Sequence, residues 1–175
     1  WQKAVPTAVA AQKLGATVFA SPWNPPASIR ENGSGGPGGG KFHLKTNSYA
    51  AYAQHLEDYC QFMKSKGVTL YSVSVQNEPD YSGEWTHWSA AEATNFLADF
   101  GDRVSCGMMS PETFQYTNKD YYKNILNNAK AFKNTKLFAT HFYGTQRSQM
   151  DFPDLEKSGK DIWMTEVYVP NSDAD

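Results

Sequence analysis

Two glutamates, Glu78 and Glu166, have the residue type and the placement that acid–base chemistry requires. Each follows a run of strand-forming residues, 70–76 in the first case and 162–165 in the second, so each carboxylate is predicted to stand where a strand ends. In a (β/α) barrel the reacting groups come from the carboxyl ends of several strands. Hydrolysis of a glycosidic bond needs two carboxyl groups facing each other across that bond. The two glutamates therefore predict a site at the ends of parallel strands that could hydrolyse a glycosidic bond.

The elements that must position these glutamates alternate along the chain. Apolar periodicity, caps and glycine stops predict helices over 4–14, 48–67, 89–100, 118–129 and 151–157. Short buried runs between them predict strands over 16–20, 68–76, 103–109, 136–141 and 161–166. The glycine-rich segment 32–40 is predicted to hold no regular structure. Strands alternating with helices in this way predict a parallel sheet with helices packed outside it.

The strand count limits the choice of fold. A closed eight-stranded barrel usually needs around 250 residues, whereas this chain has 175 residues and five predicted strands. Either the chain is part of a barrel, or it is an open doubly wound sheet. The open sheet normally carries a phosphate-binding turn such as GxGxxG between a strand and a helix, and the glycines at 33–40 stand in no such context. This favours the partial barrel.

Composition excludes several classes of partner. A hydrophobic content of 40% suits one globular domain, and the net charge of −2 comes without a run of either sign. We therefore predict no nucleic acid or membrane partner, and the N-terminus lacks the layout of a signal peptide. The histidines stand at no metal-ligand spacing, so no metal or cofactor is predicted.

Cys60 and Cys106 are expected to be two buried free thiols, with a single disulfide bond between them as the alternative.

Four motifs occur in an order that resembles a known family. They are Ser-Pro-Trp-Asn-Pro-Pro at 21–26, Gln-Asn-Glu-Pro at 76–79, His-Phe-Tyr-Gly at 141–144 and Trp-Met-Thr-Glu at 163–166. Together they resemble the catalytic barrel of glycoside hydrolase family 30, in particular its glucuronoxylan endo-β-1,4-xylanases. The resemblance covers nearly the whole chain. It implies a (β/α)8 TIM barrel of which residues 1–175 supply strands three to seven. The other strands, and a β-sandwich fused to the barrel, are expected from a longer native chain.

The resemblance also implies roles for the two glutamates. Glu166 would be the nucleophile and Glu78 the acid/base of a retaining mechanism, which needs the carboxyl groups about 5 to 5.5 Å apart. Residue types agree with this assignment, because a negative Glu166 close by favours the protonated form of Glu78. Once Glu166 is esterified by sugar, that repulsion disappears and Glu78 can act as a base.

Further side chains are implied as substrate contacts, each with a structural alternative. Asn77 would hydrogen-bond the sugar 2-hydroxyl and the nucleophile, while Trp23 and Tyr143 would wall the subsites, although Trp23 could equally be core packing. His141 could hydrogen-bond the nucleophile or be a structural histidine. Glu112, at another strand end, is expected to support the catalytic pair from behind. Trp85 and Trp88 are expected to pack the acid/base loop, with the lining of a distal subsite as the alternative.

Three functions remain open from the sequence. The first is a secreted endo-β-1,4-xylanase that cleaves (glucurono)xylan by double displacement. The second is another family 30 β-glycosidase, a β-1,6-glucanase or a glucosylceramidase, which shares both glutamates. The third is an inactive barrel fragment that binds carbohydrate. An incomplete parallel sheet exposes its edge strands, so the chain alone is expected to associate or to be poorly soluble.

Overall fold

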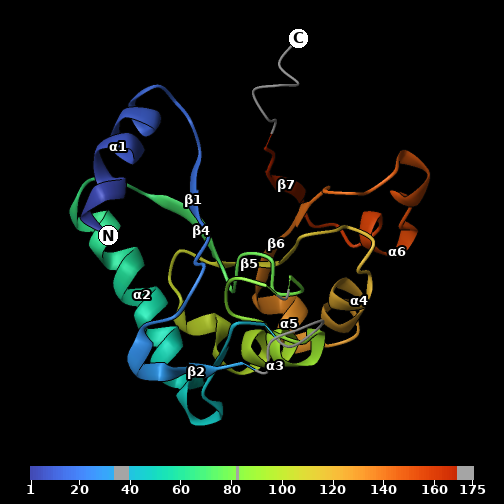
Figure 1. Ribbon diagram of the computed structural model, residues 1–175. Helices are drawn as coiled ribbons and strands as arrows, with labels where there is room; N and C mark the ends of the chain where they lie inside the picture. The colour runs from blue at the N-terminus through green and yellow to red at the C-terminus, as the bar shows by residue number, and fades with distance from the viewer. Residues whose placement is uncertain (34–39, 82, 169–175) are drawn as a thin grey trace.

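The structure is a computed structural model of the 175-residue chain, and it describes residues 1–33, 40–81 and 83–168. Helices and strands alternate along most of its length (Figure 1). The helices are α1 (Val5–Lys13), α2 (Tyr49–Ser65), α3 (Ala90–Phe100), α4 (Asp120–Leu126), α5 (Ala129–Asn134) and α6 (Pro153–Glu156). The strands are β1 (Val18–Ala20), β2 (Arg30–Asn32), β3 (Phe42–Leu44), β4 (Leu70–Ser74), β5 (Met108–Thr113), β6 (Thr135–His141) and β7 (Ile162–Glu166).

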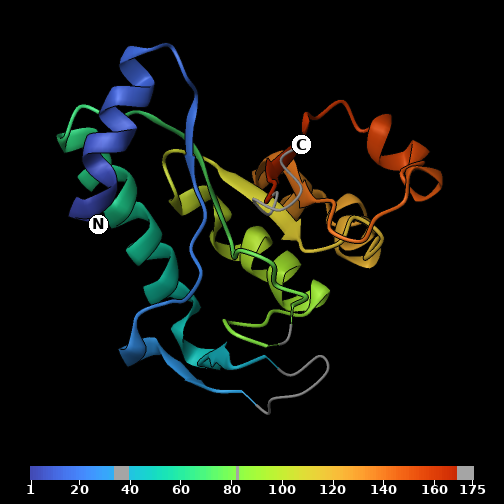
Figure 2. The ribbon, with the colours of Figure 1, turned by 45° about the horizontal axis from the view of Figure 1, so that its top comes forward.

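The main sheet has five parallel strands in the order β1-β4-β5-β6-β7. Helices α1 and α2 lie beside β1 and β4, and α3 to α5 lie further along the sheet (Figures 1 and 2). The sheet curls into a half-barrel, which confirms the prediction of a partial TIM barrel. Since all five strands run the same way, their carboxyl ends meet at one edge, and any side chain at a strand end points to the same region.

Two layers of core hold this sheet. The larger lies between the strands and the helices, where Tyr52, Phe96, Tyr122 and Ile125 are fully buried. The apolar face of each helix recurs at helical spacing, so burying it against the sheet fixes the helix there. A smaller cluster of Met109, Leu137 and Ala139 lies apart from it, with Phe19, Tyr71 and Trp163 packed against it. Burial of each large apolar side chain stabilises the fold by about 1.5–3 kcal/mol.

The N-terminus of α3 shows how the local sequence determines where a helix begins. Ser89 accepts a hydrogen bond from the Glu92 backbone N–H, and the Glu92 carboxylate accepts one from the Ser89 N–H, which completes a capping box. The predicted start of this helix is therefore confirmed. Ser48 also stands at the N-cap of α2, but its hydroxyl makes no capping bond there.

Three elements differ from the sequence-based prediction. The strand expected over 103–109 begins only at Met108, because residues 101–103 form a 3-10 turn and Gly107 has a left-handed φ of 84°. The helix expected from 118 is divided into α4 and α5, with the Asn128 side chain capping the second. Strands β2 and β3 form an antiparallel pair that was not predicted. Most of the glycine-rich segment 32–40 lies outside the described residues.

The expectation of two free thiols is wrong. Cys60 on α2 and Cys106 in the turn before β5 form a disulfide, with Cα atoms 6.1 Å apart. Cys60 lies on the buried face of its helix beside Met63, so the chain entering β5 passes close to it. This proximity is tertiary, and the separation of 46 residues along the sequence conceals it. No helix in the described part of the chain is long and apolar enough to cross a membrane.

Candidate active site

The two glutamates stand at the carboxyl edge of the half-barrel. Glu166 is the last residue of β7, and Glu78 lies four residues past the end of β4. Glu78 has a left-handed φ of 45°, a conformation that costs a non-glycine residue about 1–2 kcal/mol. The surroundings hold it there, since the Glu78 N–H donates to the carbonyl of Glu112 at 2.9 Å and the Asn77 N–H donates to that of Pro22 at 2.8 Å.

The two carboxylates converge. One oxygen of Glu78, one of Glu166 and a ring nitrogen of His141 all lie within 4.8 Å of one another. Their surroundings differ, since the Glu78 residue is 3% exposed whereas the Glu166 side chain is 36% exposed. Burial raises the pKa of Glu78; the hydrogen bond and charge of His141 act against that rise, and the negative charge of Glu166 adds to it. The raised pKa of Glu78 favours its protonated form.

His141, at the end of β6, contacts Glu78 and not Glu166. Its Nδ1 lies 2.9 Å from Glu78 Oε1 but 4.0 Å from Glu166 Oε1, so the expected hydrogen bond to Glu166 is not formed. Burial alone lowers the pKa of His141, but the nearby carboxyl groups of Glu112 and Glu78, the second of them hydrogen-bonded to Nδ1, and the charge of Glu166 outweigh it and raise the pKa to about 9. The ring is therefore a cation at neutral pH.

Tyr143 makes the contact with Glu166 that was expected of His141. Its hydroxyl donates to Glu166 Oε1 at 3.1 Å. Burial, followed by this hydrogen bond and the charge of Glu166, raises the pKa of Tyr143 to about 12, so the phenol keeps its proton. Glu166 is thus held by a neutral donor, and its second oxygen is left for other chemistry.

Aromatic rings wall the space in front of the carboxylates. An open cleft of about 520 Å³ is lined by Trp23, Glu78, Tyr81, Trp85, Phe114, Tyr143, Glu166, Val167 and Tyr168. Trp23 is 49% exposed and packs on Trp85 with ring centroids 4.6 Å apart, which places it in the cleft wall and not in the core. Phe114 stacks on Tyr143 at 5.1 Å. Such faces suit the apolar faces of sugar rings.

Asn77 lies behind Glu78 and outside the cleft lining. It is 1% exposed, and neither its amide nitrogen nor its amide oxygen has a hydrogen-bond partner among the described residues. The side-chain nitrogen of the adjacent Gln76 donates to the carbonyls of Trp23 and Asn77, whereas its side-chain oxygen has no partner among the described residues. The amide of Asn77 is therefore one of the buried polar groups beside Glu78 that can still take a new hydrogen-bond partner.

Sequence reasoning missed three groups of the site. Tyr81 and Phe114 line the cleft, and Asp80 joins them by accepting a hydrogen bond from the Phe114 N–H at 2.8 Å. Trp85 was expected to pack its loop, with the lining of a subsite as the alternative; it lines the cleft, packs on Trp23 and donates its indole N–H to the Glu78 carbonyl. Closeness to the Gln-Asn-Glu-Pro motif is the signal that could have indicated Asp80 and Tyr81. Trp88 is buried in the main core, as expected.

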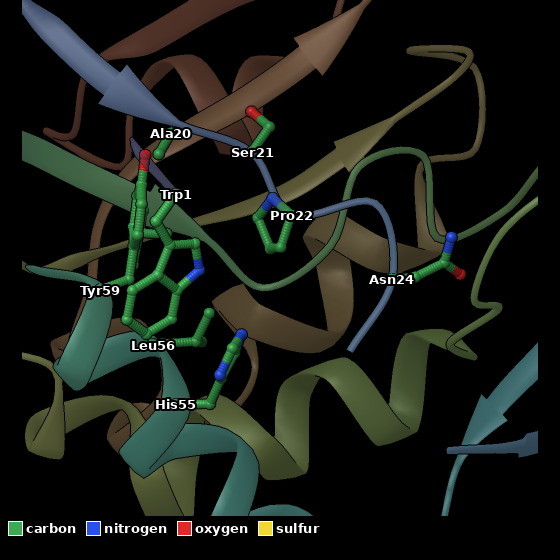
Figure 3. A pocket seen from close by; sticks show the side chains of 9 residues that line it. Trp1, Ala20, Ser21, Pro22, Asn24, His55, Leu56 and Tyr59 are labelled. Carbon is green, nitrogen blue, oxygen red and sulfur yellow. The ribbon is translucent and has the colours of Figure 1, made fainter. Parts of the chain in front are cut away.

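Among the described residues, the cluster that could hold a metal ion is Glu78, His141 and Glu166. Its imidazole is a poor ligand, because the raised pKa of His141 keeps both ring nitrogens protonated and Nδ1 already bonds Glu78. A second cavity, of about 220 Å³, lies between α2 and the end of β1 (Figure 3). Trp1, His55 and Tyr59 line one part of it and Ser21 and Asn24 another, and neither glutamate reaches it.

A curled parallel sheet that carries two convergent carboxylates and a wall of aromatic rings at its carboxyl edge is the architecture of TIM-barrel glycoside hydrolases. Comparison with known proteins agrees and narrows the class. The chain is 49% identical over 175 residues to glucuronoxylanase XynC of Bacillus subtilis strain 168, an alignment that covers 99% of this chain. It therefore resembles a partial glycoside hydrolase family 30 domain.

Solved structures show the same likeness. A family 30 endoxylanase from Clostridium papyrosolvens C71 superposes with a TM-score of 0.90 and 43% identity, covering 97% of this chain and 44% of that one. Xyn30A, a family 30 subfamily 8 xylanase from Clostridium acetobutylicum, gives 0.85 and 33%, covering 98% and 44%. No protein-family model matches the chain. The chain spans 41% of the length of the Bacillus subtilis relative.

Proposed function

We propose that this chain is the central part of the catalytic barrel of a retaining endo-β-1,4-xylanase that cleaves (glucurono)xylan. The observation that carries the proposal is the convergence of Glu78 and Glu166, within 4.8 Å, in a chain 49% identical to a glucuronoxylanase. A separation this short suits a carboxylate that attacks the sugar itself, whereas an inverting pair needs about 6.5–9.5 Å to hold a water molecule. The remaining strands and a β-sandwich would come from a longer native chain.

In the first half of the reaction Glu166 acts as the nucleophile. The carboxylate oxygen not bonded to Tyr143 attacks the anomeric carbon, and the bond from that carbon to the leaving oxygen breaks. Glu78 gives its proton to the leaving oxygen. Both steps suit the electrostatics of the site, because burial keeps that proton on Glu78 while the more exposed Glu166 is free to react.

In the second half Glu78 acts as a base. It removes a proton from water, whose oxygen attacks the anomeric carbon, and the ester bond to Glu166 breaks to restore the carboxylate. The ester carries no charge, so the repulsion that raised the pKa of Glu78 is absent at this stage. Asn77, whose amide is unpartnered, would bond the sugar 2-hydroxyl in both halves.

The cleft suits a polymer. It is open and walled by Trp23, Tyr143 and their aromatic neighbours, so a chain of pyranose rings can stack along it without having to end there. A substrate of this size cannot enter a cell intact, and we infer that the native enzyme is secreted.

A polymer panel tests the proposal. Glucuronoxylan, plain β-1,4-xylan and β-1,6-glucan are each incubated with the chain, with Glu166→Gln, and with Glu31→Gln as a control for an exposed carboxylate on β2. We expect xylo-oligosaccharides of retained anomeric configuration from the unchanged chain and from Glu31→Gln, and none from Glu166→Gln. Products from β-1,6-glucan alone would favour the alternative family 30 glycosidases. Sugar binding without turnover, in this chain and in one extended at both ends, would favour a binding protein.

A further inference from the structure

A buried row of three ionisable side chains runs behind the catalytic edge. Glu112 on β5, His141 on β6 and Glu78 after β4 are 1%, 0% and 3% exposed. His141 Nδ1 is 2.9 Å from Glu78 Oε1, and its Nε2 is 3.6 Å from Glu112 Oε1. A carboxylate therefore faces each nitrogen of one imidazole ring. Burying three such groups together is costly unless they pair, so the arrangement calls for a function.

We propose that Glu112 is a positioning residue that holds the His141 ring as a cation against Glu78. Through that cation it prepares Glu78 for its second task, the removal of a proton from water. The inference rests on the acid/base role proposed above and adds to it the group that makes the change of role possible.

Glu112 is itself held firmly. The Ser21 hydroxyl donates to Glu112 Oε1 at 2.7 Å. The backbone of Glu112 has a left-handed φ of 58°, and its carbonyl accepts the N–H of Glu78. Glu112 thus contacts the acid/base residue in two ways, directly through the backbone and indirectly through the imidazole. A side chain present only to fill space would not need a carboxyl group facing the imidazole.

The charges around the ring are all of one kind. The titratable groups that face His141 are Glu78 from the loop after β4, Glu112 from β5, Glu166 from β7 and Tyr143 from the segment after β6. Three are carboxyl groups and the fourth is a neutral phenol. The imidazole is consequently favoured as a cation throughout the cycle, even when Glu166 is esterified and its charge is absent.

The consequence for catalysis falls on the second half of the reaction. With Glu166 esterified, the charge of His141 draws Glu78 towards the carboxylate form that can act as a base. If Glu112 is made neutral, the ring loses one of its two carboxylate partners and gives up its proton more easily. Glu78 then stays protonated for longer, so hydrolysis of the glycosyl-enzyme slows while its formation does not.

The first test follows His141 directly and requires no turnover. The imidazole resonances are titrated by NMR from pH 5 to 10 in the unchanged chain and in Glu112→Gln, with His55 and His87 as internal references. We expect His141 to bind its proton at least tenfold less tightly in Glu112→Gln, while both references stay unchanged. An unaltered His141 titration in a folded variant would overturn the proposal. Should Glu112→Gln not fold, Glu112→Asp, whose shorter side chain withdraws the carboxyl group from Nε2, must shift the His141 titration in the same direction by a smaller amount, or the proposal fails.

The second test separates the two halves of the reaction with an aryl β-xyloside. In Glu112→Gln we expect a burst of phenol followed by turnover at least tenfold slower, with kcat/KM within about threefold of the unchanged enzyme, and partial recovery in Glu112→Asp. Equal losses in kcat and kcat/KM would contradict the positioning role. Absence of turnover in every variant would refute the proposed function instead, and the NMR result would still decide whether Glu112 controls the protonation of His141.

Discussion

The disulfide between Cys60 and Cys106 should contribute about 4 kcal/mol to the free energy of unfolding. The bond closes a loop with a sequence separation of 46 residues. In the chain-entropy treatment, a crosslink over such a loop removes about 13–14 cal/mol/K from the unfolded ensemble, which is about 4 kcal/mol at 25 °C. The loop contains β4 and α3, so the bond joins α2, the helix before β4, to the turn that leads into β5.

Urea unfolding measures this contribution. The unchanged chain is compared with and without a reductant, and with the double variant Cys60→Ala/Cys106→Ala, in which the reductant should have no effect. For a slope of about 2 kcal/mol per M, losing the bond should lower the midpoint by about 2 M. Alanine avoids burying a new hydroxyl at position 60, where the side chain is almost inaccessible. Two titratable thiols in the unreduced, unfolded chain, or a change below about 1 kcal/mol, would refute this reasoning.

Three further predictions follow from single contacts. The pKa of His141 is raised from 6.5 to about 9 in the folded chain. Between these two pH values the folded chain keeps a proton on His141 that the unfolded chain releases. The stabilisation of the fold by this proton is therefore complete below pH 6.5 and is lost by about pH 9. The free energy of unfolding, measured by urea titration at pH 6.5 and at pH 9, should accordingly fall by up to about 3 kcal/mol between the two. An equal free energy of unfolding at the two pH values would contradict this prediction. Ser89→Ala removes the capping box of α3 and should cost about 1 kcal/mol in the same assay, with an unchanged value refuting the capping role. Tyr143→Phe removes the hydrogen bond to Glu166 and should lower kcat/KM on xylan roughly tenfold, whereas full activity would show that this bond does not orient the nucleophile.

Sequence reasoning reached the fold through periodic elements. The buried face of α2, the cap at Ser89 and the short apolar strands each carry a local pattern, and local patterns are readable without a partner. β5 was misplaced because the apolar residues Val104, Cys106, Met108 and Met109 make segment 103–109 look like a strand, while Pro111 would normally end one. The tight turn at Gly107 divides that segment, and the strand continues through the proline.

The sequence predicted the residues of the site only where they follow a strand that could be located. Both glutamates follow strands of one parallel sheet, so their convergence follows from topology. The topology does not determine which glutamate bonds His141, because Glu78 and Glu166 both lie within 4.0 Å of its Nδ1. The directions of the three side chains determine that choice. The aromatic wall formed by Tyr81, Trp85 and Phe114 likewise depends on contacts between separate loops.

The left-handed backbone at Glu78 sets stability against function at one residue. Glycine or asparagine adopts this φ with little or no strain, and either would also remove a carboxyl group that is costly to bury. Libraries selected for thermal stability alone should therefore enrich Glu78→Gly and Glu78→Asn, whereas libraries selected for growth on xylan should discard both. The gain in stability of the Glu78→Gly or Glu78→Asn variant over the unchanged chain would measure the stability that is lost in order to keep a carboxyl group at this position.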